Sequence, residues 1–185
     1  VVVLDCGDLH HPPGTLDLLR RLGANVVRIE VPWASLAPDP TSRTPPAHFR
    51  AGDPASYPAP GWAPYDAIVR AAQSRGIGVY LTLGPPPPLW AGGLGAPESS
   101  GRLAADWRPS TVDFRAFVRA VGTRYSGSYT PPGQATPLPR VSFWSIWNEP
   151  NYGQDLAPQS TGHSAISLSP GLYRGLLDAA WKALQ

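Results

Sequence analysis

The amino-acid sequence predicts an α/β fold built on a parallel sheet, and two features of the chain indicate it. Short apolar runs rich in β-branched or aromatic residues alternate with segments of helical periodicity. The connections that follow the apolar runs are long, whereas most of those that precede them are short. Loops at the carboxyl ends of parallel strands build the ligand sites of such proteins. We therefore expect right-handed βαβ units with functional residues in the long loops.

The individual elements follow from this pattern. Buried strands are expected at residues 26–31, 78–83 and 141–147. Helices are expected at residues 15–22, 65–74, 112–125 and 170–184. Gly23 and Gly76 predict helix ends, because glycine readily adopts the left-handed conformation of a C-cap. Ser169 and Pro170 predict an N-cap and a first-turn proline. Residues 1–4 are a candidate first strand, which would give four βα units.

The long connections span residues 32–61, 85–109 and 150–169 and are rich in proline, glycine and tryptophan. The proline-rich link at 126–140 is an exception, since it precedes a strand. No internal repeat or interdomain linker is recognisable, so we expect residues 1–185 to belong to one domain. The chain has no methionine and opens on Val1, which indicates a piece of a longer protein.

Composition argues against several classes of partner. The formal net charge of +2 comes from 15 basic and 13 acidic residues spread along the chain, so no nucleic-acid partner is expected. No run of about 18 apolar residues and no signal-peptide pattern is present, so no membrane partner is expected. The single cysteine, Cys6, excludes an intrachain disulfide.

The sequence also lacks the residue patterns that are typical of metal sites and of nucleotide-binding loops. The four histidines show no metal-ligand spacing: His10, His11, His48 and His163. Residues 162–166 fall one glycine short of a nucleophile elbow, and no strand precedes them. Lys182, the only lysine, lies in the last expected helix, which argues against a phosphate-binding loop. We expect neither a metal ion nor an organic cofactor.

The candidate chemistry lies at the end of the third apolar run, in Asn148-Glu149-Pro150. A carboxyl group held among tryptophans loses solvation, which would raise the pKa of Glu149 towards the range of a proton donor. Asn148 offers both a donor and an acceptor to a sugar hydroxyl. By spacing alone, a plain strand-ending turn explains the motif at least as well.

Residues 144–151 (WSIWNEPN) resemble the fourth-strand signature of glycoside hydrolase clan A, which includes cellulases, β-mannanases, β-xylosidases and β-galactosidases. Residues 23–29 with Trp33 are similar to the clan's second strand, and residues 83–90 resemble the proline and tryptophan loop of some members. The resemblance extends from about residue 15 to the final helix. It implies a (β/α)8 barrel of the TIM type, of which about four βα units, the N-terminal half of one catalytic domain, are present.

The resemblance implies a retaining hydrolase of β-linked glycans or glycosides. Glu149 would be the general acid/base, Asn148 would bind the sugar 2-hydroxyl, and Arg28 would support the catalytic carboxylates. The clan's nucleophile stands at the end of the seventh strand, beyond Gln185, so the isolated chain is expected to be inactive. By the same resemblance, an extracellular location is compatible with the parent protein.

A retaining hydrolase needs a second carboxyl group about 5–5.5 Å from the first. Glu30 shares a strand face with Arg28, because residues two apart point the same way, and an ion pair between them is the simpler explanation. Glu98 is expected in a solvated loop. We expect neither to be the nucleophile.

Seven tryptophans suggest carbohydrate contacts, because pyranose rings stack on indole. Trp33, Trp90 and Trp147 are the sugar-contact candidates, with loop packing as the alternative. Tyr152 could reach the site or cover its rim. Trp144 and Trp181 are expected in core and helix packing.

An alternative hypothesis is that the chain is a truncated or degenerate half barrel without catalytic activity. Such a chain would at most bind carbohydrate or associate with another chain. The unpaired edges and apolar inner faces of a half barrel predict self-association.

Overall fold

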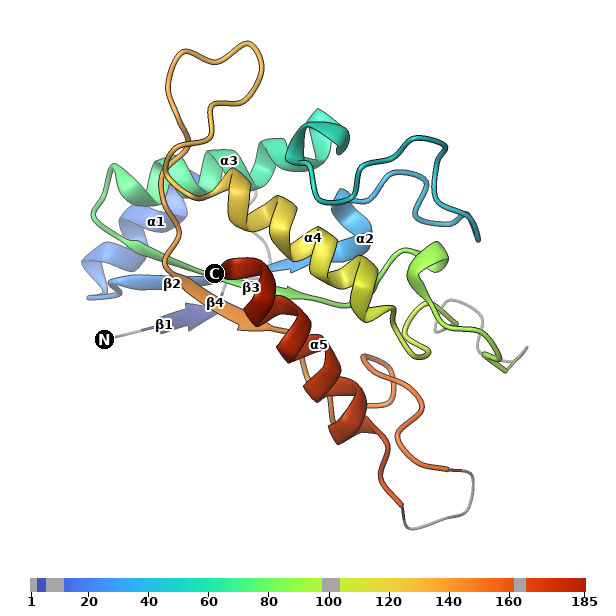
Figure 1. Cartoon of the computed structure of the whole chain (residues 1–185). Helices are drawn as coiled ribbons and strands as arrows, with labels where there is room; N and C mark the ends of the chain where they lie inside the picture. Colours follow the sequence, from blue (N-terminus) through green and yellow to red (C-terminus); the bar gives the residue numbers. More distant parts are fainter. Residues whose placement is uncertain (1–2, 6–11, 98–103, 162–165) are drawn as a thin grey trace.

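In the computed structural model, the described residues are 3–5, 12–97, 104–161 and 166–185. Within them, parallel strands form one sheet in the order β1-β2-β3-β4, with bounds Val3–Asp5, Val26–Pro32, Gly78–Gly84 and Phe143–Ile146. The longer helices are α1 (Pro12–Arg21), α3 (Ala59–Gln73), α4 (Thr111–Arg124) and α5 (Ser169–Leu184) (Figure 1). Short helical turns are α2 (Trp33–Leu36), η1 (Pro54–Ser56) and η2 (Leu89–Ala91). The predicted parallel α/β class is confirmed.

The two faces of the sheet differ in burial, because side chains alternate along each strand. Val27, Ile29 and Val31 of β2 are buried in one core with residues of the helices. Arg28 and Glu30 belong to the opposite face, where Arg28 is half-buried and Glu30 is exposed. The helices therefore cover one face of the sheet, and the described residues leave the other partly open.

Glycine ends α1 and α3 as predicted. Gly23 and Gly76 have φ angles of 86° and 66°, in the left-handed region. The following residues turn back onto the helices, since the N–H of Ala24 donates to Leu19 O at 2.9 Å and that of Ile77 to Ala72 O at 3.0 Å. These closures direct the chain from each helix into the next strand.

Two predicted helix starts are corrected. Helix α3 begins at Ala59, well before residue 65, because a Pro-Gly pair that usually marks a loop is tolerated in the first helical turn. Helix α5 begins at Ser169 itself, with Leu168 as N-cap and no side-chain cap bond, so the predicted N-cap role of Ser169 is wrong. In α4, by contrast, the Ser110 side chain accepts from Asp113 N at 3.2 Å.

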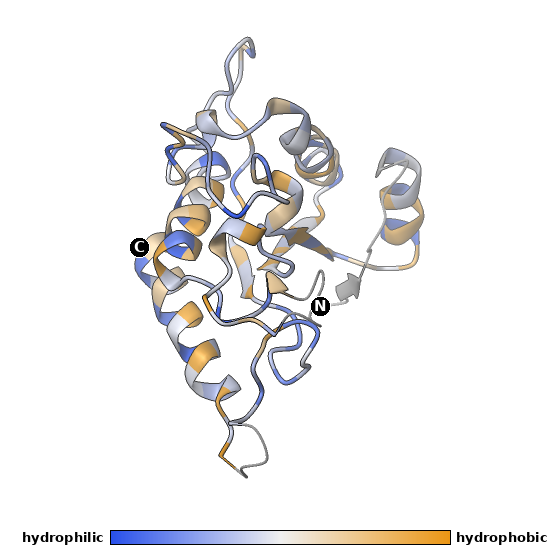
Figure 2. Cartoon of the chain, turned by 90° about the vertical axis from the view of Figure 1, so that its right-hand side faces the viewer, coloured by the Kyte–Doolittle hydropathy of each residue, from blue (hydrophilic) through white to orange (hydrophobic). Residues whose placement is uncertain are grey.

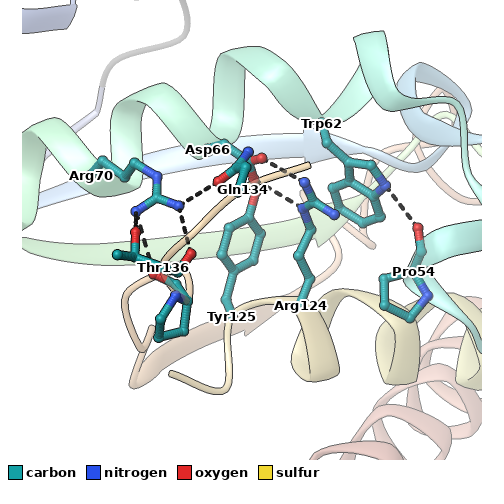
Figure 3. A network of polar contacts seen from close by, with 9 residues as sticks. Pro54, Trp62, Asp66, Arg70, Arg124, Tyr125, Gln134 and Thr136 are labelled. Carbon is teal, nitrogen blue, oxygen red and sulfur yellow. Dashed lines mark hydrogen bonds and ion pairs between the residues drawn. The ribbon is translucent and has the colours of Figure 1, made fainter. Parts of the chain in front are cut away.

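A buried polar network joins α3 to α4 on the helical side of the molecule (Figure 3). Asp66 accepts from Arg124 Nε at 2.9 Å, from Arg124 Nη2 at 2.5 Å and from the Tyr125 hydroxyl at 3.0 Å. The Arg124 guanidinium also lies 4.6 Å from the ring centroid of Trp62. Burial alone would lower the pKa of Arg124, but the hydrogen bonds and charge of Asp66 outweigh it and raise that pKa. Burial raises the pKa of Tyr125, and the charge of Asp66 raises it further.

Some predictions concern residues outside the described ranges: Cys6, His10, His11, Glu98, His163 and most of the 162–166 segment. Within the described ranges, no helix has the length and apolar character needed to cross a lipid bilayer.

Candidate active site

A cleft of about 480 Å³ lies at the carboxyl ends of the strands. Each of the three long loops contributes to its walls, through Thr41, Pro86 and Asp155 among others. Glu30 at the end of β2 and Asn148 just after β4 complete its polar lining. The predicted position of the long loops at the carboxyl ends of the strands is therefore confirmed. Among the described residues, no group of three or more His, Cys, Asp or Glu side chains is arranged to hold a metal ion.

Arg28 connects the ends of three strands beside this cleft. Its Nε donates to Thr82 Oγ1 of β3 at 2.8 Å, and its Nη2 donates to Asn148 Oδ1 at 2.9 Å. The same Nη2 lies 3.2 Å from Glu30 Oε1, which is the ion pair expected from their shared strand face. Planar guanidinium groups suit such multiple contacts, since they offer five donors in a fixed geometry. Arg28 therefore fixes Asn148 relative to β2 and β3.

The backbone around Asn148 is strained. Trp147 and Glu149, on either side of it, have φ angles of 67° and 37°, which side chains other than glycine rarely adopt. Such positions cost about 1–3 kcal/mol each and gather at functional sites. They also explain why β4 ends at Ile146 instead of the expected Trp147.

Glu149 lies three residues past the end of β4, and its side chain is exposed. The expected burial among tryptophans is therefore wrong, because the neighbouring Trp147 ring turns away into the core. Glu149 is not among the residues that line the cleft, although the adjacent Asn148 is. The backbone O of Glu149 accepts from Tyr152 N at 2.8 Å, so a turn follows the motif at once.

Two of the predicted sugar-contact tryptophans belong to the core. Trp33 is 0% exposed and stacks on Phe117 at a centroid distance of 5.4 Å. Trp147 is 2% exposed and packs edge-on against Phe114 of α4 at 5.4 Å. Trp33 begins α2 directly after β2 and is buried there, and the positive φ of Trp147 breaks the alternation of β4. The expectation that these two indoles contact a sugar is corrected.

The remaining aromatic candidates lie nearer the surface. Trp90 is half-buried, donates its Nε1 to Pro38 O at 3.1 Å and packs edge-on against Trp33. Tyr152 is 47% exposed in the turn after Glu149. Neither lines the cleft, so their contact with a sugar stays a prediction.

Asp155 is a cleft residue that the sequence did not reveal. Its Oδ2 accepts from Asn148 Nδ2 at 3.1 Å, and its backbone O accepts from Trp147 Nε1 at 2.8 Å. Asp106, which is 3% exposed, also lines the cleft. Both lie in long loops without periodicity, and no sequence signal places such residues opposite a strand end.

Known proteins share this architecture although their sequences differ. No protein-family model and no curated protein matches the chain. Fpglu1 from Fervidobacterium pennivoraus matches with a TM-score of 0.58 and 15% identity, over 95% of this chain and 38% of its own length. The β-glycosidase from the hyperthermophile Thermosphaera aggregans matches with a TM-score of 0.55 and 18% identity, over 95% of this chain and 39% of its own. The chain therefore shares the fold of part of each of these two structures.

A weaker similarity relates the chain to a family 39 glycoside hydrolase from the gut symbiont Bacteroides cellulosilyticus WH2, with a TM-score of 0.45 and 19% identity. That match covers 98% of this chain and 29% of the other. The chain thus spans less than two-fifths of the length of each of these solved structures.

Gly84 at the end of β3 allows the close approach of the segment after β4. A Cβ atom at Gly84 would lie 3.1 Å from Asn148 N and 3.3 Å from Trp147 Cα, both backbone atoms. We expect Gly84→Ala to displace Asn148 from Arg28 and to lower the free energy of unfolding by about 1 kcal/mol. Urea unfolding followed by tryptophan fluorescence measures this change.

Gly78 provides the matched control, since it lies on the same strand and face. A Cβ atom there would first meet Val26 Cγ2, at 3.4 Å, which is ordinary contact. Gly78→Ala is expected to leave stability unchanged or slightly higher, because alanine restricts the unfolded chain. Equal losses in the two variants would contradict the proposed close approach at Gly84.

Proposed function

We propose that the chain is the N-terminal half of the single catalytic domain of a retaining O-glycoside hydrolase, a (β/α)8 barrel that acts on β-linked glycans or glycosides. The observation that carries the proposal is the hydrogen bond from Arg28 Nη2 to Asn148 Oδ1 at 2.9 Å. It joins the two clan-like strand motifs at a cleft on the carboxyl ends of parallel strands, within a glycoside hydrolase fold.

In the proposed mechanism Glu149 protonates the leaving glycosidic oxygen and then activates water. Its position after the strand end and its solvent access leave room for a glycoside beside it. Asn148 contacts the sugar 2-hydroxyl, and Arg28 holds Asn148 in place. A nucleophilic carboxylate completes the double displacement, and we place it outside this chain. Glu30 already pairs with Arg28 and is not assigned that role. The reaction as proposed needs no cofactor.

A second candidate is that the chain alone is inactive and at most binds carbohydrate or associates with another chain. The observation that favours it is an apolar hollow of about 810 Å³ at the open edge of β4, lined by Phe143 and by Leu177 and Trp181 of α5. These three side chains are 54%, 41% and 66% exposed. Figure 2 shows hydrophobic residues along α5, interspersed with hydrophilic ones. Such surface favours association.

One assay separates the two candidates. The 185-residue chain and the complete protein are compared on a panel of aryl β-glycosides, with size-exclusion chromatography of the chain. We expect hydrolysis by the complete protein and none by the chain. Activity of the chain alone would place a second catalytic carboxylate within these residues, and inactivity of the complete protein on every β-glycoside would refute the proposed function.

A further inference from the structure

The side-chain amide of Asn148 is held at both ends. Its Oδ1 accepts from Arg28 Nη2 at 2.9 Å, and its Nδ2 donates to Asp155 Oδ2 at 3.1 Å. Amide groups have two nearly symmetrical orientations, which differ by exchange of the oxygen and the nitrogen. The partners therefore decide which of the two is adopted.

The chemistry of the two partners permits one orientation only. A guanidinium group can only donate hydrogen bonds, and an ionised carboxylate can only accept them. Rotation of the Asn148 amide would place N–H against N–H at Arg28 and oxygen against oxygen at Asp155. Arg28 and Asp155 therefore favour the same orientation, and Asp155 adds a hydrogen bond at the amide nitrogen.

Asp155 is itself fixed in place. Its backbone O accepts from Trp147 Nε1 at 2.8 Å, and its backbone N donates to Tyr152 O at 3.0 Å. Trp147 is 2% exposed and packed against α4, so its hydrogen bond holds Asp155 against the core. Asp155 also lines the same cleft as Asn148.

We propose that Asp155 is the positioning residue of the site, which fixes the amide of Asn148 so that one N–H remains directed to a ligand oxygen. An amide nitrogen carries two hydrogens, and Asp155 takes one of them. The ligand this arrangement suits is a hydroxyl or ether oxygen of a carbohydrate; that part of the inference rests on the proposed function. The proposed orientation of the Asn148 amide does not depend on the proposed function.

The orientation is tested on the chain itself by NMR. The sequence contains three asparagines, Asn25, Asn148 and Asn151, so selective ¹⁵N-asparagine labelling gives three side-chain amide groups. In the wild type we expect one Asn148 amide proton to lie downfield of those of the exposed Asn151 and to exchange more slowly with water. Asp155→Ala should move that proton to the position and exchange rate of Asn151.

Two further variants keep the test decisive. Asp155→Asn retains an acceptor oxygen and the side-chain shape but loses the charge, so it should move the Asn148 proton part of the way. This variant adds a fourth labelled side-chain amide, at position 155, to the three of the wild type. Gln154→Ala, a change of the exposed neighbouring residue, should leave it unchanged. Asn25, before β2, reports whether the fold persists. An Asn148 signal that is the same in the wild type, Asp155→Ala and Asp155→Asn overturns the inference.

Kinetics of the complete protein test the ligand part. Asp155→Ala should lower kcat/KM about tenfold for a glycoside with a 2-hydroxyl, the effect of about one hydrogen bond, and should change that of the 2-deoxy analogue much less. Equal losses of kcat/KM on both substrates would show that Asp155 does not act through a contact between Asn148 and the 2-hydroxyl. If the complete protein hydrolyses no glycoside, the proposed function fails, whereas the NMR result still decides the position of Asn148.

Discussion

Replacement of Glu149 by glutamine in the complete protein is expected to lower kcat for glycosides with poorly acidic leaving groups by about 10²–10⁴-fold. Glutamine keeps the size of the side chain but can neither donate a proton to the departing oxygen nor take one from water. Steady-state hydrolysis of a natural β-linked disaccharide measures the effect. The loss in the first step should be much smaller for an aryl glycoside with an acidic phenol, because that leaving group departs without protonation.

The control is a carboxylate far from the cleft. Asp178 of α5 is 60% exposed and lies 3.8 Å from Arg174 across one helical turn. Asp178→Asn removes the same charge and should leave kcat within about twofold of the wild type, since exposed pairs of this kind contribute little. Near-normal hydrolysis of the disaccharide by the Glu149→Gln variant would refute the assignment of Glu149 as acid/base.

Asp66→Ala is expected to destabilise the fold by about 3–5 kcal/mol, the largest effect we anticipate on stability. The side chains of Asp66 and Arg124 are 10% and 6% exposed, so the change leaves a buried guanidinium without its counter-charge. The Tyr125 hydroxyl loses the same acceptor. The midpoint and slope of urea unfolding give the change in the free energy of unfolding. Asp66→Asn, which keeps an acceptor oxygen, should cost less than Asp66→Ala.

Asp17 offers a matched pair at the surface. It accepts from Arg75 Nε at 2.7 Å and from Arg75 Nη2 at 3.1 Å, and this hydrogen bonding lowers the pKa of the Asp17 carboxyl. Because its side chain is 54% exposed, water replaces the lost partner in Asp17→Ala, and the urea midpoint should hardly move. If the Asp66 and Asp17 variants shifted the midpoint equally, burial would not be what makes the Asp66 network stabilising.

The parallel α/β class and the location of the cleft could be predicted because they depend on local regularities. The apolar runs set β2 and β3, and Gly23 and Gly76 end the helices where the left-handed backbone requires it. Strand alternation also predicted that Arg28 and Glu30 share a face, and their ion pair is present. Each of these conclusions needs only the repeat of a helix or a strand and its nearest neighbours.

Side-chain environments at the end of β4 could not be predicted in the same way. Trp33 and Trp147 were expected to contact sugar but are buried, and Glu149 was expected to be buried but is exposed. Alternation stops at Trp147, whose positive φ turns its ring into the core. Beyond that point the sequence carries no periodic rule that says which way a side chain faces.

The sequence alone thus determined the order and direction of the elements and the strand-end position of the Asn148-Glu149 motif, since local backbone preferences act over a few residues. Only the tertiary structure decided which residues the motif meets. Asp155 contacts Asn148 from a loop, and Thr82 contacts Arg28 from the neighbouring strand. Such contacts depend on how separate elements pack in space, which no spacing along the chain encodes.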